Sequence, residues 1–193
     1  MTEEKAGLPV LSFADAAAWE AWLAAQPRES KGLWLRLARA GNSNSSLTRA
    51  QAIDGALCHG WIDGQLGSYD AAWFLTRFTP RKARSKWSEN NCKRAAELAR
   101  DGRIAAAGQA EIDAARADGR WDAAYAPAST AAEPEDLKAA LDADPAARAF
   151  FDTLTGANRY AILYRVQTAK KPETRPARIA KFVALCARGE TLH

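Results

Sequence analysis

Cysteine and histidine are scarce in this sequence, and no long apolar run occurs in it. The three cysteines, Cys58, Cys92 and Cys186, are odd in number, far apart and without a CxxC pair. This pattern indicates neither a disulfide framework nor a metal site, and it predicts reduced, mostly buried thiols and no cofactor. No stretch approaches the ~20 apolar residues of a membrane span. The acidic start also lacks the apolar core of a signal peptide, so we expect a cytoplasmic protein without membrane insertion.

What is present suits an ordinary globular chain. Hydrophobic residues make up 48% of the 193 residues and charged residues 26%, and there are seven tryptophans. Each tryptophan can bury roughly 150–250 Å², so the capacity to form a core is ample. The length fits one compact domain, or a domain with an appended helical lobe.

Charge is segregated along the chain, although the net charge is only +4. Residues 77–103 carry nine Lys or Arg and three Asp or Glu, whereas residues 109–152 carry four Lys or Arg and ten Asp or Glu. Residues 159–188 are basic again, with eight Lys or Arg and one Glu. Two interpretations remain open: solvated helix faces that attract each other across the fold, or an anion-binding surface.

The first 80 residues mix helical and strand patterns. Leu33, Leu35 and Leu37 alternate with more polar neighbours, as in a half-buried strand. Thr48 is a candidate N-cap, and Pro80 cannot donate to a ladder and closes the last strand. In chain order we expect a helix at 12–26, a strand at 32–40, a polar loop at 41–46, a helix at 47–60 and hairpin strands at 61–66 and 72–79.

Beyond Arg81 the pattern is helical to the end. Gly102 and Gly119 are expected helix stops, and Pro134 and Pro145 stand at first-turn positions, the latter behind a capping Asp144. Expected helices cover about 88–99, 107–117, 158–169 and 175–188. The fold class is therefore α+β: a small three-stranded antiparallel sheet with packed helices, followed by a helical C-terminal region. We place the boundary between an α+β region at 1–130 and a helical region at 131–193.

Three segments carry a family resemblance. They read A-x-C-x-G-W-I-D-G at 56–64, F-T-P-R at 78–81 and S-x-W-S-x-x-N at 85–91. With these motifs, and with matching residues at 119–122 and 173–175, the chain resembles the YdeI/OmpD-associated, or bacteriocin-protection, family over roughly residues 10–190. His59 departs from the pattern, where Phe or Tyr is more usual.

The resemblance implies a protective role and an indirect link to an outer-membrane porin. It implies no agreed mechanism and no catalytic set. The candidate site must therefore be read from the residues themselves.

Asp63 and the basic segment after the hairpin form the first part of the candidate site. The hairpin sets Asp63 beside the strand that bears Arg77 and leads to Arg81, so an ion pair there is one interpretation. The other is the floor of a polar ligand pocket.

The second part is the entry into the helix expected after residue 88, where backbone amides lack partners and attract anions. Its Ser and Asn residues could equally be simple caps. Arg175 is either a further cationic contributor or the partner of an acid such as Asp122. The predicted ligand-binding residues are Trp61, Asp63, Arg81, Lys82, Ser85, Trp87, Ser88, Asn90, Asn91 and Arg175.

The sequence favours a non-enzymatic binding or stress-protection protein with a small anionic ligand. One alternative is a nucleic-acid binder that uses 77–103 and stacks bases on Trp61 or Trp87, although the acidic stretch opposes phosphates. Another is an enzyme on a small anionic substrate. Cys58 and His59 are a poor catalytic pair, because adjacent helical residues do not face each other.

Overall fold

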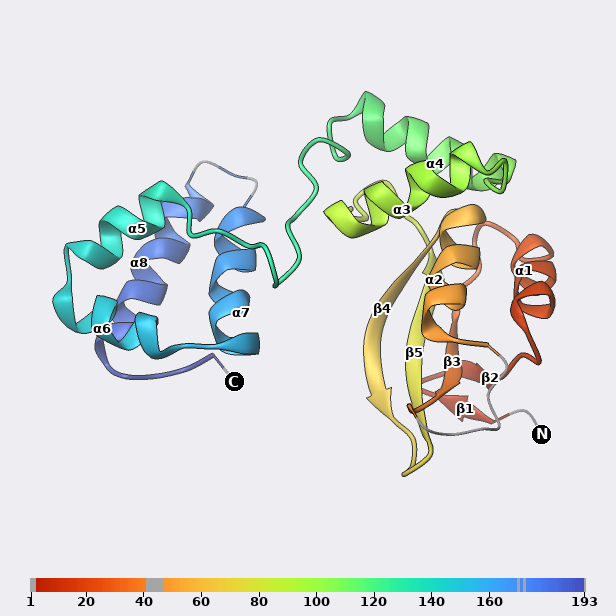
Figure 1. Ribbon diagram of the computed structural model, residues 1–193, viewed down its shortest axis with the longest axis horizontal. Helices are drawn as coiled ribbons and strands as arrows, with labels where there is room; N and C mark the ends of the chain where they lie inside the picture. The colour runs from red at the N-terminus through yellow and green to blue at the C-terminus, as the bar shows by residue number, and fades with distance from the viewer. Residues whose placement is uncertain (1–2, 41–46, 170, 172, 193) are drawn as a thin grey trace. The chain divides into compact units, whose positions relative to one another are not determined.

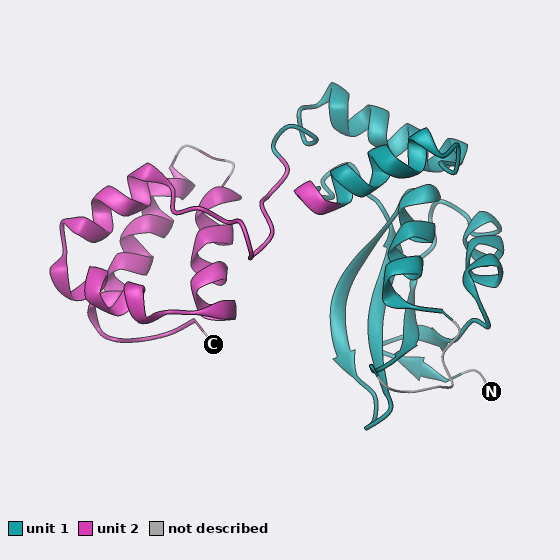
Figure 2. Ribbon diagram, in the orientation of Figure 1, with its two compact units in different colours: residues 1–87, 91–123 teal, residues 88–90, 124–193 magenta. Residues whose placement is uncertain are grey.

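The computed structural model describes residues 3–40, 47–169, 171 and 173–192, and the polar loop predicted at 41–46 lies outside them. The chain divides into two compact units (Figure 2). Unit 1 contains residues 1–87 and 91–123, and unit 2 contains residues 88–90 and 124–193.

Unit 1 is built on a twisted sheet (Figure 1). The described strands are β1 (Glu4–Lys5), β2 (Leu8–Leu11), β3 (Leu33–Ala38), β4 (Trp61–Ser68) and β5 (Trp73–Pro80). They are ordered β1-β2-β3-β5-β4, and every neighbouring pair is antiparallel except β2 and β3, which run parallel.

The predicted three-stranded antiparallel sheet is therefore wrong in strand number and in one strand direction. The three predicted strands are present as β3, β4 and β5, but β1 and β2 extend the sheet. β1 has two residues and β2 has four, with Pro9 among them, so both are too short to give a strand pattern in the sequence. The helix between β2 and β3 supplies the crossover that a parallel pair requires.

Two helices, α1 (Ala16–Ala24) and α2 (Arg49–Cys58), cover one face of this sheet (Figure 1). Beyond the end of the sheet lie α3 (Glu89–Arg100, whose first two residues belong to unit 2) and α4 (Ala106–Ala117). Trp19 and Leu23 of α1 pack with Leu35 of β3 and Phe78 of β5 in the main core. Trp19 is fully buried, and its indole Nε1 donates to the carbonyl of Ala52 on α2 at 3.0 Å.

Two glycines allow close approaches that shape the end of the sheet. Gly60 has a φ of +74°, which favours glycine, and it turns the chain from α2 into β4. A Cβ on Gly108 would lie 2.3 Å from the carbonyl oxygen of Cys58, so only glycine lets the start of α4 meet the end of α2. The ends of α1, α2, β5 and the start of α4 thereby gather at one place.

Unit 2 is a helical bundle with its own core. Its helices are α5 (Glu135–Asp142), α6 (Pro145–Thr153), α7 (Gly156–Gln167) and α8 (Thr174–Ala187). Leu137, Phe151, Ile162 and Phe182 are among its buried residues. Asp144 caps α6 as predicted, accepting from the amide of Ala147 at 3.0 Å.

Pro134, predicted in a first turn, is instead the N-cap residue before α5. Three further predicted helix signals are confirmed. Thr48 caps α2 in a capping box with Gln51. Gly102 and Gly119 take positive φ after α3 and α4. Beyond residue 88 the described chain is helical or irregular, apart from one isolated bridge between Ser88 and Tyr125. None of the described helices has both the length and the apolar character needed to cross a membrane.

Candidate functional site

A cavity of about 120 Å³ lies where these elements meet in unit 1. The end of α1, the turn from α2 into β4, the end of β5 and the first turn of α4 all contribute to its wall. The backbone fixes this corner, since the amide of Arg81 donates to the carbonyl of Gly60 at 2.9 Å and that of Ala105 donates to Cys58 at 3.0 Å. We call this space the Arg81 cavity, after the cation in its wall.

Arg81 is the most unusual residue of this wall, because it is a cation with only 4% of its surface exposed. Its guanidinium lies over the ring of Trp87, 3.5 Å from the ring centre. Nη1 donates to the carbonyl of Lys86 at 3.1 Å. Nε and Nη2 are buried and have no hydrogen-bond partner among the described residues.

The charge of Arg81 has no carboxylate in direct contact within the described chain. Burial lowers its pKa to about 10, and Glu111 is the strongest opposing influence. The guanidinium is still protonated at neutral pH. Glu111 itself is buried and forms an ion pair with Arg28, so its charge is already compensated.

Helix ends of both signs meet at the cavity, since α1 and α2 end there and α4 begins there. Their dipoles therefore oppose one another. The local charge is decided by side chains: Arg81 and Arg28 against Glu111 leave one excess positive charge.

A second layer of residues holds the Arg81–Trp87 pair in place. Trp121 packs on Trp87 with ring centres 5.0 Å apart. Arg120 donates to the carbonyl of Ser85 at 3.1 Å and pairs with Asp118 at 2.7 Å. The motif residues at 119–122 thus support the segment that carries Trp87.

His59 lines the cavity, and burial lowers its pKa below the ordinary value. Its neighbour Cys58 is fully buried, with its pKa raised to about 11 by burial. Cys58 is therefore a neutral thiol at physiological pH, which argues against a nucleophile there.

The structure divides the predicted site residues of unit 1 between two places. Trp61 and Arg81 line the Arg81 cavity. Asp63 and Lys82 line a different hollow of about 310 Å³, together with Arg77. Asp63 pairs with Arg49 at 3.1 Å, rather than with the basic residues of the neighbouring strand.

The serines and asparagines have local roles. The hydroxyl of Ser85 accepts from the amide of Lys82 at 2.9 Å and closes a turn. α3 begins at Glu89, whose amide donates to the carbonyl of Tyr125 at 3.0 Å. A carboxylate in the first turn disfavours an anion there. Ser88 is buried before the helix, and within it Asn90 is exposed and Asn91 half-buried.

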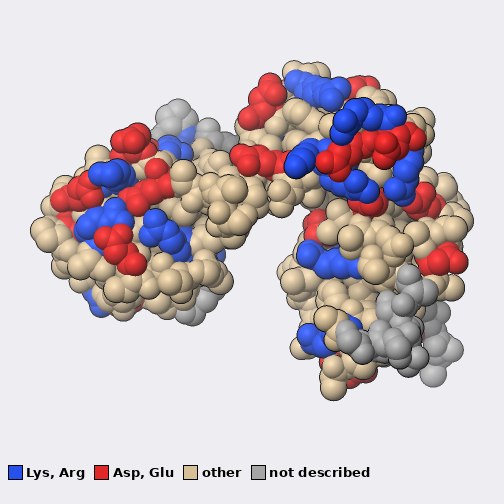
Figure 3. Space-filling view, in the orientation of Figure 1, with Lys and Arg blue, Asp and Glu red and all other residues tan. Residues whose placement is uncertain are grey.

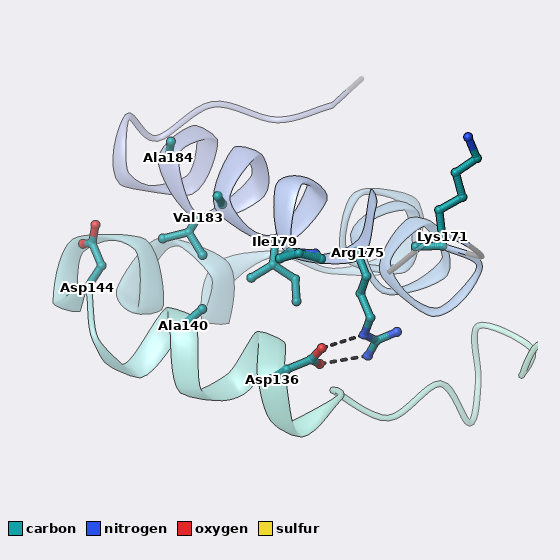
Figure 4. Close-up of a pocket in the computed structure, with 11 residues that line it drawn as sticks. Asp136, Ala140, Asp144, Lys171, Arg175, Ile179, Val183 and Ala184 are labelled. Atoms are coloured by element: carbon teal, nitrogen blue, oxygen red, sulfur yellow. Dashed lines mark hydrogen bonds and ion pairs between the residues drawn. The ribbon is translucent and has the colours of Figure 1, made fainter. Parts of the chain in front are cut away.

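Arg175 belongs to unit 2, where it joins helices (Figure 4). It donates to both carboxylate oxygens of Asp136 on α5, at 2.5 and 2.8 Å, and to the carbonyl of Val166 at the end of α7. The partner is thus Asp136 rather than Asp122. The pair borders a groove of about 700 Å³ between α5 and α8, whose floor includes Ala140 and Ile179.

Part of the segregated charge of the sequence is paired within each unit. On the face drawn in Figure 3, basic and acidic side chains lie next to one another in several places. Arg94 pairs with Asp54 and Glu97 in unit 1, and Arg148 pairs with Glu133 and Asp152 in unit 2. For these residues the pairs support the interpretation of solvated helix faces over that of an anion-binding surface.

Neither tryptophan proposed for base stacking offers its ring to solvent. Trp61 is 3% exposed and Trp87 is 2% exposed. The nucleic-acid alternative therefore loses both of its predicted aromatic contacts.

Two residues at this corner were not indicated by the sequence. Arg28 lines the cavity, and Glu111 is its ion-pair partner. They are 83 residues apart, and neither stands in a motif. The internal position of Glu111 on the apolar side of α4, beside Ile112, was the one available signal.

Comparison with known proteins assigns the two halves of the chain separately. Residues 11–111, more than half of the 193, match the family described as a domain of unknown function (DUF8412), and the chain belongs to that family. Residues 130–189 match the family described as bacteriocin-protection, YdeI or OmpD-associated, which confirms the predicted resemblance for this part of the chain rather than for the predicted span of 10–190. The segments at 56–64, 78–81 and 85–91 fall in the first match. No curated protein and no solved structure matches the chain.

Proposed function

We propose that this protein binds a small anion in the Arg81 cavity, and that it acts as a binding protein in a protective, cytoplasmic role rather than as an enzyme. The match at 130–189 supports the protective part. The buried guanidinium supports the anion.

One observation carries the proposal: the Nε–Nη2 edge of Arg81 is buried and has no partner among the described residues. A buried cation without a paired anion costs several kcal/mol. The cation–π contact with Trp87 stabilises the buried charge by about 2 kcal/mol. A bound anion would offset the part of the burial cost that this contact leaves.

The same geometry favours binding over catalysis. Cys58 is held as a neutral thiol, and Asp63 is engaged by Arg49 in another hollow. The cavity offers the groups of a binding site: the guanidinium of Arg81, and the apolar side chains of Leu23, Pro27 and Trp61.

The test is anion-dependent stabilisation of the full chain and of Arg81→Met. A ligand at 100 times its Kd stabilises a protein by about 2.7 kcal/mol. We expect at least one class in a panel of phosphate, sulfate and carboxylates to stabilise the wild type against urea. Arg81→Met should show no such response.

The matched control is Arg84→Met, which removes an exposed charge from the same basic segment. It should keep the full response, because Arg84 does not line the cavity. Absence of stabilisation by every anion would refute the proposal, and so would an equal loss in both variants.

A further inference from the structure

We infer that the anion is a monocarboxylate with a short aliphatic chain, an inference that rests on the proposed function of the Arg81 cavity. Three features lead to it: the free edge of the guanidinium, the local charge and the apolar wall.

The free edge of Arg81 matches a carboxylate. On a guanidinium, Nε–H and one Nη2–H run parallel, and together they bind the two oxygens of one carboxylate. Nη1 is occupied by the carbonyl of Lys86, and one face is covered by Trp87. The Nε–Nη2 edge is therefore the part of Arg81 that is left for a ligand.

Neither nitrogen of this edge touches solvent, although Arg81 lines the cavity. Binding requires a small rotation of the guanidinium toward the cavity. This rotation keeps the guanidinium over the ring of Trp87 and lengthens the bond from Nη1 to the carbonyl of Lys86.

The local charge selects a monoanion. Arg81 and Arg28 carry two positive charges and Glu111 carries one negative charge, so one negative charge neutralises the site. A phosphate or sulfate dianion would leave a net negative charge in a buried place, which is costly.

Part of the wall is apolar. Leu23, Pro27, Trp61, Pro80 and Ala107 line the space beside the polar side chains of Gln26, Arg28 and His59. Its volume of about 120 Å³ equals roughly four waters at ~30 Å³ each. This room suits a carboxylate of two to four carbons, whose alkyl end contacts the apolar side chains.

The experiment measures binding to the full chain by calorimetry and thermal unfolding at constant ionic strength. The probes are acetate, propionate, butyrate and hexanoate, with phosphate, sulfate and neutral propionamide for comparison. Each methylene that fits should raise affinity roughly fourfold. Affinity should therefore climb from acetate to butyrate and fall for hexanoate, and propionamide should not bind.

Two variants locate the binding. Arg81→Met should reduce propionate affinity by at least roughly tenfold, since a charged hydrogen bond contributes 1.5–3 kcal/mol. Ala107→Leu adds bulk at an exposed wall position without touching Arg81, and it should weaken butyrate more than acetate. Ala107→Leu keeps the test decisive if Arg81→Met fails to fold.

The outcomes separate this inference from the proposed function. Tighter binding of phosphate or sulfate than of propionate would overturn the carboxylate inference and leave an anion site at Arg81. Binding of propionamide, or carboxylate binding unaffected by both variants, would also overturn it. No binding of any anion would overturn the inference and the proposed function together.

Discussion

Arg81 holds a positive charge where the described chain supplies no carboxylate in direct contact. Burial lowers its pKa to about 10, which corresponds to about 3 kcal/mol of destabilisation at neutral pH. The unfolded chain holds this proton more tightly, so the full cost applies below pH 10 and is relieved as the pH rises above 10.

Replacing Arg81 should therefore do little harm to the ligand-free protein. In Arg81→Met the charge cost disappears, while about 2 kcal/mol of interaction with Trp87 is lost. We expect the variant to be equally stable or about 1 kcal/mol more stable by urea unfolding without anions. A loss of more than about 3 kcal/mol would show that Arg81 stabilises the fold, because removing one member of a buried, already paired charge has a cost of this size.

His59 should give the protein a pH-dependent stability. Its pKa is lowered by burial, so the unfolded chain binds the proton first as pH falls through the ordinary value of 6.5. We expect the urea midpoint to drop between pH 7.5 and 5.5, and the drop to be smaller in His59→Phe. Carboxylates titrate near pH 4 and contribute little in this range. Identical pH profiles for the two proteins would contradict this.

At the scale of elements, α2 ends directly before His59 and Gly60, which line the cavity. The start of α2 is stabilised by a capping box. Thr48 accepts from the amide of Gln51 at 3.2 Å, and the Gln51 side chain accepts from the amide of Thr48 at 2.9 Å. Thr155 occupies the same position before α7 but makes no side-chain capping bond.

The two threonines make a matched pair. Thr48→Ala should cost about 0.5–2 kcal/mol of stability, because it leaves a helix amide without its acceptor. Thr155→Ala should change stability by less than about 0.5 kcal/mol. Urea unfolding of both variants measures the difference, and equal costs would show that the capping box contributes nothing.

The helices were predictable from sequence because their signals are local. Thr48, Gly102, Gly119 and Asp144 act on backbone groups within a turn of themselves. β2 was not predictable in this way. It is short, includes Pro9, and gains its place from pairing with β3, more than 20 residues further along.

The candidate site was predictable in part, because its motifs are local in the sequence while its contacts join residues that are far apart in the chain. The motifs directed attention to Arg81, Trp87 and Trp61. They did not show that Arg81 is buried, or that Asp63 turns to Arg49 in a separate hollow. Those outcomes depend on how Arg28 and α4 reach the same corner, which no local pattern encodes.

At the scale of the molecule, the helical core of unit 2 and the main core of unit 1 share no residue. Phe151 is fully buried in the core of unit 2. Phe151→Ala should cost about 3–5 kcal/mol. We expect faster amide hydrogen exchange in α5 to α8, with protection in β3 unchanged. Exchange that rises equally in β3 would show that the units unfold together.

The most direct measurement follows the Nε–H signal of Arg81 in proton–nitrogen spectra of the full chain, assigned by its absence from Arg81→Met. An anion bound at the Nε–Nη2 edge must change this group first. We predict a saturable shift of this signal with propionate and none with propionamide. A signal that keeps its position at saturating concentrations of every anion tested would contradict the presence of an anion site at Arg81.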